Sequence, residues 1–209
     1  SVTIIDVSNP ADIVARDTET DENNGFGVLK GAKGVDTFTI GANTYAIVAA
    51  VNDNGVQIID VSDPENIVAR DAETDGLNGF TELEGARGVK TFTIGANTYA
   101  IIASVEDNGV QIIDVSNPAN IVARDAETDG QNGFDALSGA ADVEIFTIGA
   151  STYAIVASMN GDGVQIIDVS NPADIVARDA LFDTDFSAGA AVLQEPKGVD
   201  TFTVDASTY

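Results

Sequence analysis

The sequence Gly55-Val-Gln-Ile-Ile-Asp-Val-Ser-Asp-Pro64 decides the fold, because it returns almost unchanged at residues 109–118 and 163–172. A shorter copy opens the chain at residues 2–10. One aspartate holds the same place in every copy, at intervals of 54 residues: Asp6, Asp60, Asp114 and Asp168. A fixed interval of this length is the signature of a tandem repeat.

Each repeat divides into four short segments with the pattern of β-strands. In the first complete unit they are residues 34–40, 45–50, 56–61 and 67–71, separated by turns rich in Gly, Asn, Asp and Pro. The second and third segments are apolar on both faces, so we expect them to lie between packed layers. The fourth is the most polar and is predicted to form the outer edge. Three tyrosines are expected to begin the second strands: Tyr45, Tyr99 and Tyr153.

Four antiparallel strands per unit, with apolar inner strands, are typical of a β-propeller blade. We therefore predict an all-β protein, a β-propeller built from four-stranded antiparallel blades of 54 residues. An open blade array or a filament-forming β-repeat is the alternative. Residues 1–209 are interpreted as a single repeat array and as a fragment of a longer one. Its units are about 1–33 (partial), 34–87, 88–141, 142–197 and 198–209 (partial).

The sequence YAIVA at residues 45–49, followed by GVQIIDVSDP at residues 55–64, resembles the LVIVD repeat family. The resemblance covers the second, third and fourth strands of every unit, but not the loop at residues 75–86. It implies a β-propeller scaffold and a place among the surface proteins of bacteria and archaea. It implies nothing about a ligand, because the family is defined by its scaffold.

Two apolar residues recur in the long loop between one unit and the next. Phe80 and Leu83 stand three residues apart, the spacing of one helical face, which predicts a short helical turn. The pairs Phe26 with Leu29 and Phe134 with Leu137 repeat the arrangement. We expect these side chains to anchor each loop to the core.

The same loops carry acidic residues at alternate positions, and these are the candidate metal ligands. They are Asp17, Glu19 and Asp21 in the first loop, Asp71, Glu73 and Asp75 in the second, and Asp125, Glu127 and Asp129 in the third. The sequence DAETDG resembles the first half of a calcium loop, where carboxylates at positions one, three and five converge around a glycine turn. Asn78 and Asn132 could add further oxygen ligands.

A second interpretation of these acids stays open. They form the solvent face of a fourth strand that continues past Asp71. Glu82 falls at the twelfth position of the second loop, where a calcium loop has a bidentate ligand, but Val28 and Ala136 stand there in the other two. The fourth loop changes from Leu181 onward and is expected to bind no calcium. Calcium is the one cofactor that the sequence indicates.

Composition excludes several classes of function. The chain has 34 acidic and 9 basic residues, a net charge of −25, which repels phosphate backbones and anionic lipids. We therefore expect neither nucleic-acid binding nor membrane insertion. Cysteine and histidine are absent, which excludes disulfides, thiol chemistry and catalytic triads that use histidine.

The repetition favours a structural role. We expect a non-enzymatic extracellular structural or adhesive repeat protein of a cell surface or filament, because repeated surfaces bind repeated partners or each other. The expected partners are other copies of the chain, a cell-surface protein or a glycan. A calcium-dependent carbohydrate- or protein-binding module is the alternative. A hydrolase on a propeller scaffold comes third, since the repeat symmetry is expected to break only in the last loop and no catalytic residues are predicted.

Overall fold

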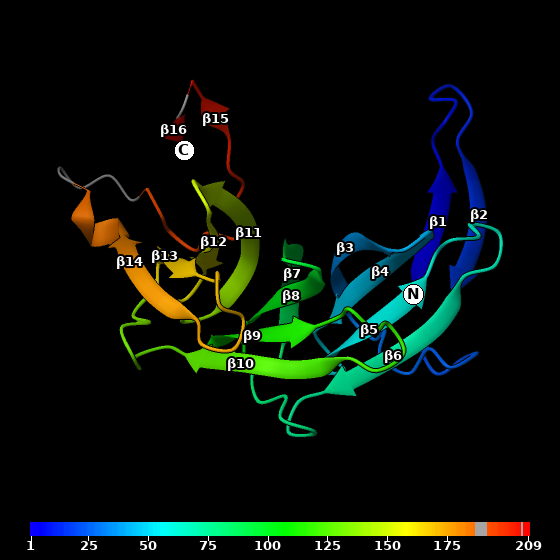
Figure 1. Cartoon of the computed structure of the whole chain (residues 1–209), viewed down its shortest axis with the longest axis horizontal. Helices are drawn as coiled ribbons and strands as arrows, with labels where there is room; N and C mark the ends of the chain where they lie inside the picture. The colour runs from blue at the N-terminus through cyan, green and yellow to red at the C-terminus, as the bar shows by residue number, and fades with distance from the viewer. Residues whose placement is uncertain (187–191, 206) are drawn as a thin grey trace.

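The structure, a computed structural model, describes residues 1–186, 192–205 and 207–209. Its sheets stand side by side along an arc (Figure 1). Three sheets have four antiparallel strands, and two smaller sheets of two strands each lie at the ends of the arc. Among the described residues these two small sheets share no strand pairing, so the arc is open.

The strands follow the chain from one sheet to the next. The N-terminal sheet pairs β1 (Val2–Asp6) with β2 (Val14–Glu19). Blade 1 contains β3 (Ala32–Ile40), β4 (Asn43–Ala50), β5 (Gly55–Asp60) and β6 (Val68–Thr74). Blade 2 contains β7 (Ala86–Ile94), β8 (Asn97–Ser104), β9 (Gly109–Asp114) and β10 (Val122–Thr128). Blade 3 contains β11 (Ala140–Ile148), β12 (Ser151–Ser158), β13 (Gly163–Asp168) and β14 (Val176–Phe182), and is followed by a 3-10 turn, η1 (Asp183–Asp185), β15 (Thr203–Val204) and β16 (Ser207–Thr208).

The predicted blade architecture is confirmed. Each blade is an antiparallel meander whose strands pair in chain order, and the small sheets leave the array open at its ends. The register is the same in all three blades: Tyr45 pairs with Asp60, Tyr99 with Asp114 and Tyr153 with Asp168. The second strands begin two residues before the tyrosines, because the turn residues Asn43 and Asn97 already pair with the first strand.

The core lies between the blades. The second and third strands are buried on both faces in blades 1 and 2, as their apolar sequence predicts. One face of blade 1 packs against blade 2 through Ile47, Ala49, Val56 and Ile58 on one side and Ala100, Ile102 and Ile113 on the other. The residues at equivalent positions pack blade 2 against blade 3. Each blade therefore depends on its neighbour for its core.

The first strands β3, β7 and β11 run together along the inside of the arc (Figure 1). They approach so closely that glycine is needed. A Cβ on Gly34 would lie 2.3 Å from the carbonyl oxygen of Arg87, and one on Gly88 would lie 2.7 Å from the Cα of Asp142. The side chains around these glycines consequently share one space at the centre.

The long loops differ from prediction in one respect. The described part of residues 75–86 contains no helix, so the predicted helical turn is wrong. Asn78 and Gly79 adopt φ of 52° and 88°, and the resulting tight turn pairs Leu77 with Phe80. The predicted anchoring is confirmed, since Phe80 is only 1% exposed and Leu83 is fully buried. In the divergent loop after β14, residues 187–191 lie outside the described part.

Candidate functional site

The first acidic residue of each loop binds the neighbouring blade. The Asp71 carboxylate accepts a hydrogen bond from the main-chain N–H of Ile121, 50 residues further along, at 2.7 Å. Asp17 accepts the same bond from Ile67 at 2.8 Å, and Asp125 accepts it from Ile175 at 2.7 Å. We call these three bonds the inter-blade latches.

The second and third acids bond within their own loops. Glu73 accepts a hydrogen bond from the side-chain amide of Asn78 at 3.0 Å, and Asp75 accepts one from the N–H of Leu83 at 3.1 Å. The other two loops repeat both bonds, through Glu19 with Asn24, Asp21 with Leu29, Glu127 with Asn132 and Asp129 with Leu137. The amide groups of Asn78 and Asn132 therefore serve as donors to the acids.

These bonds decide how the candidate metal ligands are placed. β6 continues to Thr74 and β10 to Thr128, so the fourth strand does run on past Asp71 and Asp125. Asp75 and Asp129 lie beyond its end, and the acids bond to protein groups, so they are not simply its solvent face. The three carboxylates of each loop are held by three separate partners. Within the described part of the chain, no group of three or more acidic side chains is arranged to hold a metal ion. Calcium binding stays a prediction, and in this arrangement the acids do not form a shared site for it.

Glu82 breaks the repeat inside the second loop. Its carboxylate is buried against blade 2, where Oε1 accepts a hydrogen bond from the Thr128 hydroxyl at 2.5 Å. Oε2 has no partner among the described residues. Burial raises the pKa of Glu82 to about 7, and the nearby Asp107, Asp75 and Glu127 add to the shift. Burial also raises the pKa of Asp107 to about 6.

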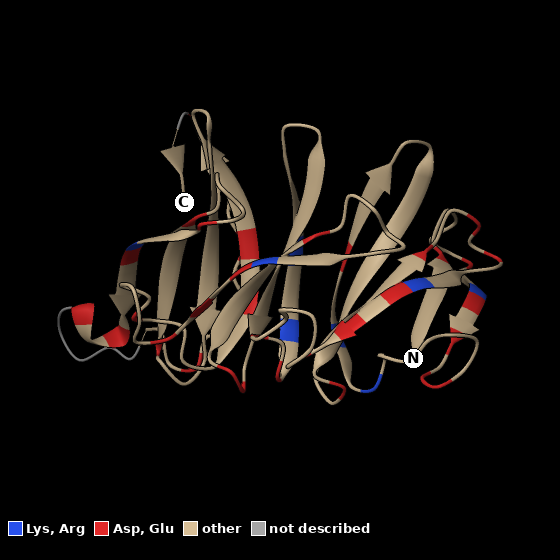
Figure 2. Cartoon of the chain, turned by 60° about the horizontal axis from the view of Figure 1, so that its bottom comes forward, with Lys and Arg blue, Asp and Glu red and all other residues tan. Residues whose placement is uncertain are grey.

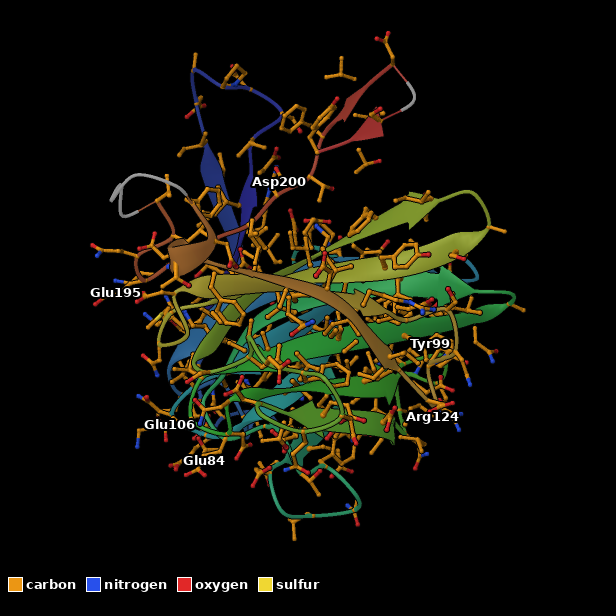
Figure 3. All side chains as sticks on the ribbon, turned by 90° about the vertical axis from the view of Figure 1, so that its left-hand side faces the viewer. Glu84, Tyr99, Glu106, Arg124, Glu195 and Asp200 are labelled. Atoms are coloured by element: carbon orange, nitrogen blue, oxygen red, sulfur yellow. The ribbon has the colours of Figure 1, made fainter. Side chains whose placement is uncertain are left out.

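At the opposite end of the blades, aspartates and arginines form a ladder of ion pairs. Tyr99 and Arg124 lie at this end, while Glu84 and Glu106 lie at the loop end (Figure 3). Four pairs repeat with a distance of 2.5 Å between the guanidinium and the carboxylate: Arg16 with Asp6, Arg70 with Asp60, Arg124 with Asp114 and Arg178 with Asp168. Asp60 also accepts the N–H of Ser62 at 3.0 Å, the turn contact that its position before a proline turn predicts. These pairs are structural.

The concave centre of the arc holds a pocket that sequence reasoning missed. Its volume is about 460 Å³, and we call it the axial pocket. It is lined by β3, β7, β11 and residues 197–199, and its charged residues are Lys33, Arg87, Lys90, Asp142, Glu144 and Lys197. In Figure 2 the strands near the middle of the array carry both basic (blue) and acidic (red) segments.

The axial pocket corrects the expectation that the repeat symmetry breaks only in the last loop. Asp36, Lys90 and Glu144 occupy one equivalent position of the three first strands, and Asp142 replaces the glycine found at 34 and 88. These differences were visible in the sequence. Their importance was not, because only the assembled arc brings the three strands together.

Both acids of the axial pocket already have partners. Glu144 pairs with Lys90 at 2.9 Å through one oxygen and accepts the N–H of Ile145 at 3.0 Å through the other. The hydrogen bond from Lys90 to Glu144 raises the pKa of the lysine. Asp142 accepts the N–H of Val199 at 3.0 Å. Glu144 is thus held by Lys90 of β7 and by its own strand, and Asp142 is held by Val199 of the C-terminal segment.

Blades of four antiparallel strands, set side by side with their first strands at a common centre, define a protein of the β-propeller class. The LVIVD repeat matches the chain at residues 1–16, 43–69, 97–124 and 151–177, so this is an LVIVD-repeat protein. Comparison with curated proteins gave no significant match.

Solved structures share the fold at low sequence identity. A protein from Lactobacillus plantarum is 12% identical, with a TM-score of 0.60 over 87% of this chain and 51% of its own. A functionally unknown protein from Desulfotomaculum acetoxidans is 15% identical, with a TM-score of 0.52 over 72% and 42%. The periplasmic gluconolactonase of Pseudomonas aeruginosa is 10% identical, with a TM-score of 0.51 over 73% and 40%. The chain spans about half or less of these proteins, and the likeness concerns the fold alone.

In the described residues, no helix has the length and the apolar character that crossing a membrane requires.

Proposed function

We propose that this protein is a non-enzymatic, extracellular structural or adhesive repeat protein of a cell surface or filament, and that it associates with other copies of itself. The observation that carries the proposal is the repetition of nearly the same blade, because repeated surfaces bind repeated partners or each other. The N-terminal sheet has an apolar face of the kind that another unit covers in the blades. Ile5, Val7 and Ile13 are 50%, 66% and 62% exposed there. At equivalent positions in the blades, Ile59 and Val115 are fully buried and Ile67 is 4% exposed.

The buried equivalents indicate what such a face packs against. Ile59 and Ile67 pack against the N-terminal sheet, and Val115 packs against blade 1, so each of them meets the unit that precedes it in the chain. A preceding unit of a longer chain and a blade from a second copy both offer this chemistry, because all blades repeat nearly the same sequence. Exposed apolar surface of this kind favours association, at about 25 cal/mol per Å² removed from water.

The placement of the acids supports a structural role over a catalytic one. The residues that most resembled a metal site hold the blades and loops together through hydrogen bonds. Glu144 accepts a hydrogen bond from Ile145 of its own strand and Asp142 accepts one from Val199, so both carboxylates of the axial pocket are hydrogen-bonded. The negative net charge and the absence of cysteine are compatible with an exported protein, as the LVIVD resemblance implies.

The test is the oligomeric state in solution, measured by light scattering over a range of protein concentrations. We expect the mass to rise with concentration, and the variants Ile5→Asp and Ile13→Asp to shift the protein toward monomer. Leu77→Asp is the matched control, because Leu77 is 58% exposed but lies on a loop. A protein that stays monomeric throughout, or an equal effect of Leu77→Asp, would contradict self-association and leave a different protein or a glycan as the partner.

The non-enzymatic part of the proposal needs its own experiment. Hydrolysis of chromogenic glycosides and of lactones should give no turnover above that of the Glu144→Gln variant. Turnover that disappears in Glu144→Gln would show that the axial pocket is catalytic.

A further inference from the structure

The axial pocket gathers cations in a protein that has few of them. Four of the nine basic residues line it, although the chain carries a net charge of −25. Three of the four occupy one repeating position, directly before the residue at 34, 88, 142 and 198. This position is Lys33, Arg87 and Ala141 in the three first strands, and Lys197 in the segment before β15. The repeat thus places a cation at this position in every unit but the one with Ala141, and all three cations line the pocket.

These cations differ from the arginines of the Asp–Arg ladder. Each ladder arginine is paired with a carboxylate of its own blade. Lys33 and Arg87 form no ion pair with any residue that the structure describes. Arg87 donates to the sulfur of Met159 at 3.1 Å, and a thioether is a weak acceptor. Lys33 and Arg87 therefore do not line the pocket in order to neutralise nearby carboxylates through ion pairs.

The remaining charges of the axial pocket leave Lys33 and Arg87 available. Glu144 is engaged by Lys90, and Lys197 pairs with Glu195 at 3.3 Å. Asp142 accepts a hydrogen bond from Val199 and contributes the one negative charge that has no cationic partner among the described residues. A ligand with one anionic group can reach the cations, whereas an extended polyanion would also meet Asp142 and the acidic surface.

We propose that the axial pocket binds a small ligand through a single oxyanion group, a carboxylate, sulfate or phosphate, held between Lys33 and Arg87. Arginine presents donors in a planar fork that matches two oxygens of such a group, and lysine adds a point charge. A volume of about 460 Å³ is within the range of small-molecule sites. This inference goes beyond the structural role proposed above and does not depend on it.

Isothermal titration at low ionic strength tests the proposal with four probes: sulfate, inorganic phosphate, D-glucuronate and D-glucose. We expect at least one of the three anions to bind at a single site and glucose, the uncharged counterpart of glucuronate, to give no binding. The anion that binds most tightly identifies the oxyanion class. The proposal is overturned if none of the three anions binds at concentrations on the order of 10 mM. A dissociation constant of about that size is the weakest expected from a single charge-assisted contact.

Variants locate the site. Lys33→Gln and Arg87→Gln should each weaken binding by about 10- to 100-fold, the value of one hydrogen bond to a charged group. Asp142→Asn should strengthen binding, because it removes the negative charge in the pocket. Lys30→Gln is the matched control, since Lys30 is exposed, lies three residues from Lys33 and does not line the pocket. If Lys30→Gln weakens anion binding as much as Lys33→Gln does, the anion is attracted by positive charge in general. That result would overturn the assignment of the site to Lys33 and Arg87.

Discussion

Asp71 and Ile121 connect two blades through a hydrogen bond of 2.7 Å between a carboxylate and a main-chain N–H. The same bond joins Asp17 to Ile67 and Asp125 to Ile175. A blade of this array is therefore held by its neighbour through polar contacts at its outer edge as well as through the apolar core. At these three positions the acidic residue of the repeat has a structural role, which is to join one unit to the next.

Removal of a latch should destabilise the array. We expect Asp71→Ala to lower the free energy of unfolding by about 1–3 kcal/mol, because the main-chain N–H of the buried residue Ile121 loses its hydrogen-bond acceptor. Urea denaturation measures the change. Asp179→Ala is the control. Asp179 accepts the N–H of the next residue, Ala180, as Asp71 accepts that of Ala72, but among the described residues it bonds to no following blade. Equal effects of the two variants would contradict a special role for the latch.

Phe80 should contribute strongly to stability. Its ring is 1% exposed beneath the loop, so Phe80→Ala should lower the free energy of unfolding by about 3–5 kcal/mol. Leu77→Ala changes an exposed residue of the same loop and should cost less than about 0.5 kcal/mol. A loss below about 1 kcal/mol for Phe80→Ala would show that the loop can repack without the ring.

Glu82 should make the stability depend on pH. Its pKa rises from the ordinary value of 4.5 to about 7 in the folded protein, so the folded state binds the proton more tightly than the unfolded state. Stability should consequently fall as the pH rises from about 4.5 to about 7, and level off above that. Asp107, with a pKa of about 6, acts in the same direction.

The measurement for Glu82 is the melting temperature between pH 4.5 and pH 8. Glu82→Gln should reduce the fall but not remove it, because Asp107 remains. Glu65→Gln alters a surface carboxylate and should keep the wild-type profile. Identical profiles for the wild type and Glu82→Gln would show that the buried carboxyl does not titrate in this range.

Calcium binding by the acidic loops has a direct test. Asp71, Glu73 and Asp75 would each have to exchange an existing hydrogen bond for the ion, so we expect weak binding, with a dissociation constant on the order of 10⁻⁴–10⁻³ M. Millimolar calcium should then raise the melting temperature of the wild type relative to a chelator. The change Glu73→Leu copies Leu181 of the fourth loop and should reduce the rise. Equal melting temperatures with calcium and with chelator would refute the calcium prediction.

The sequence by itself determined the repeat of 54 residues, the four strands of each unit and the apolar inner strands. Strand patterning and turn residues act over a few neighbouring positions, so one linear sequence is enough to reveal them. The burial of Phe80 and Phe134 could be predicted for the same reason, because their loop repeats with the rest of the unit. The helical turn was wrong because a spacing of three also suits the tight turn that Asn78 and Gly79 form.

The tertiary structure alone decided the partners of the charged residues. Asp71 meets Ile121 across 50 positions, and Glu82 meets Thr128 across 46. The axial pocket joins Lys33, Arg87 and Lys197 from three different inner segments. Their meeting depends on the angle between successive blades, which is set by the packing of whole apolar faces and is written in no local pattern. For that reason the acidic loops, which alternate so clearly in sequence, became blade contacts, while the cations that look scattered in sequence meet in one pocket.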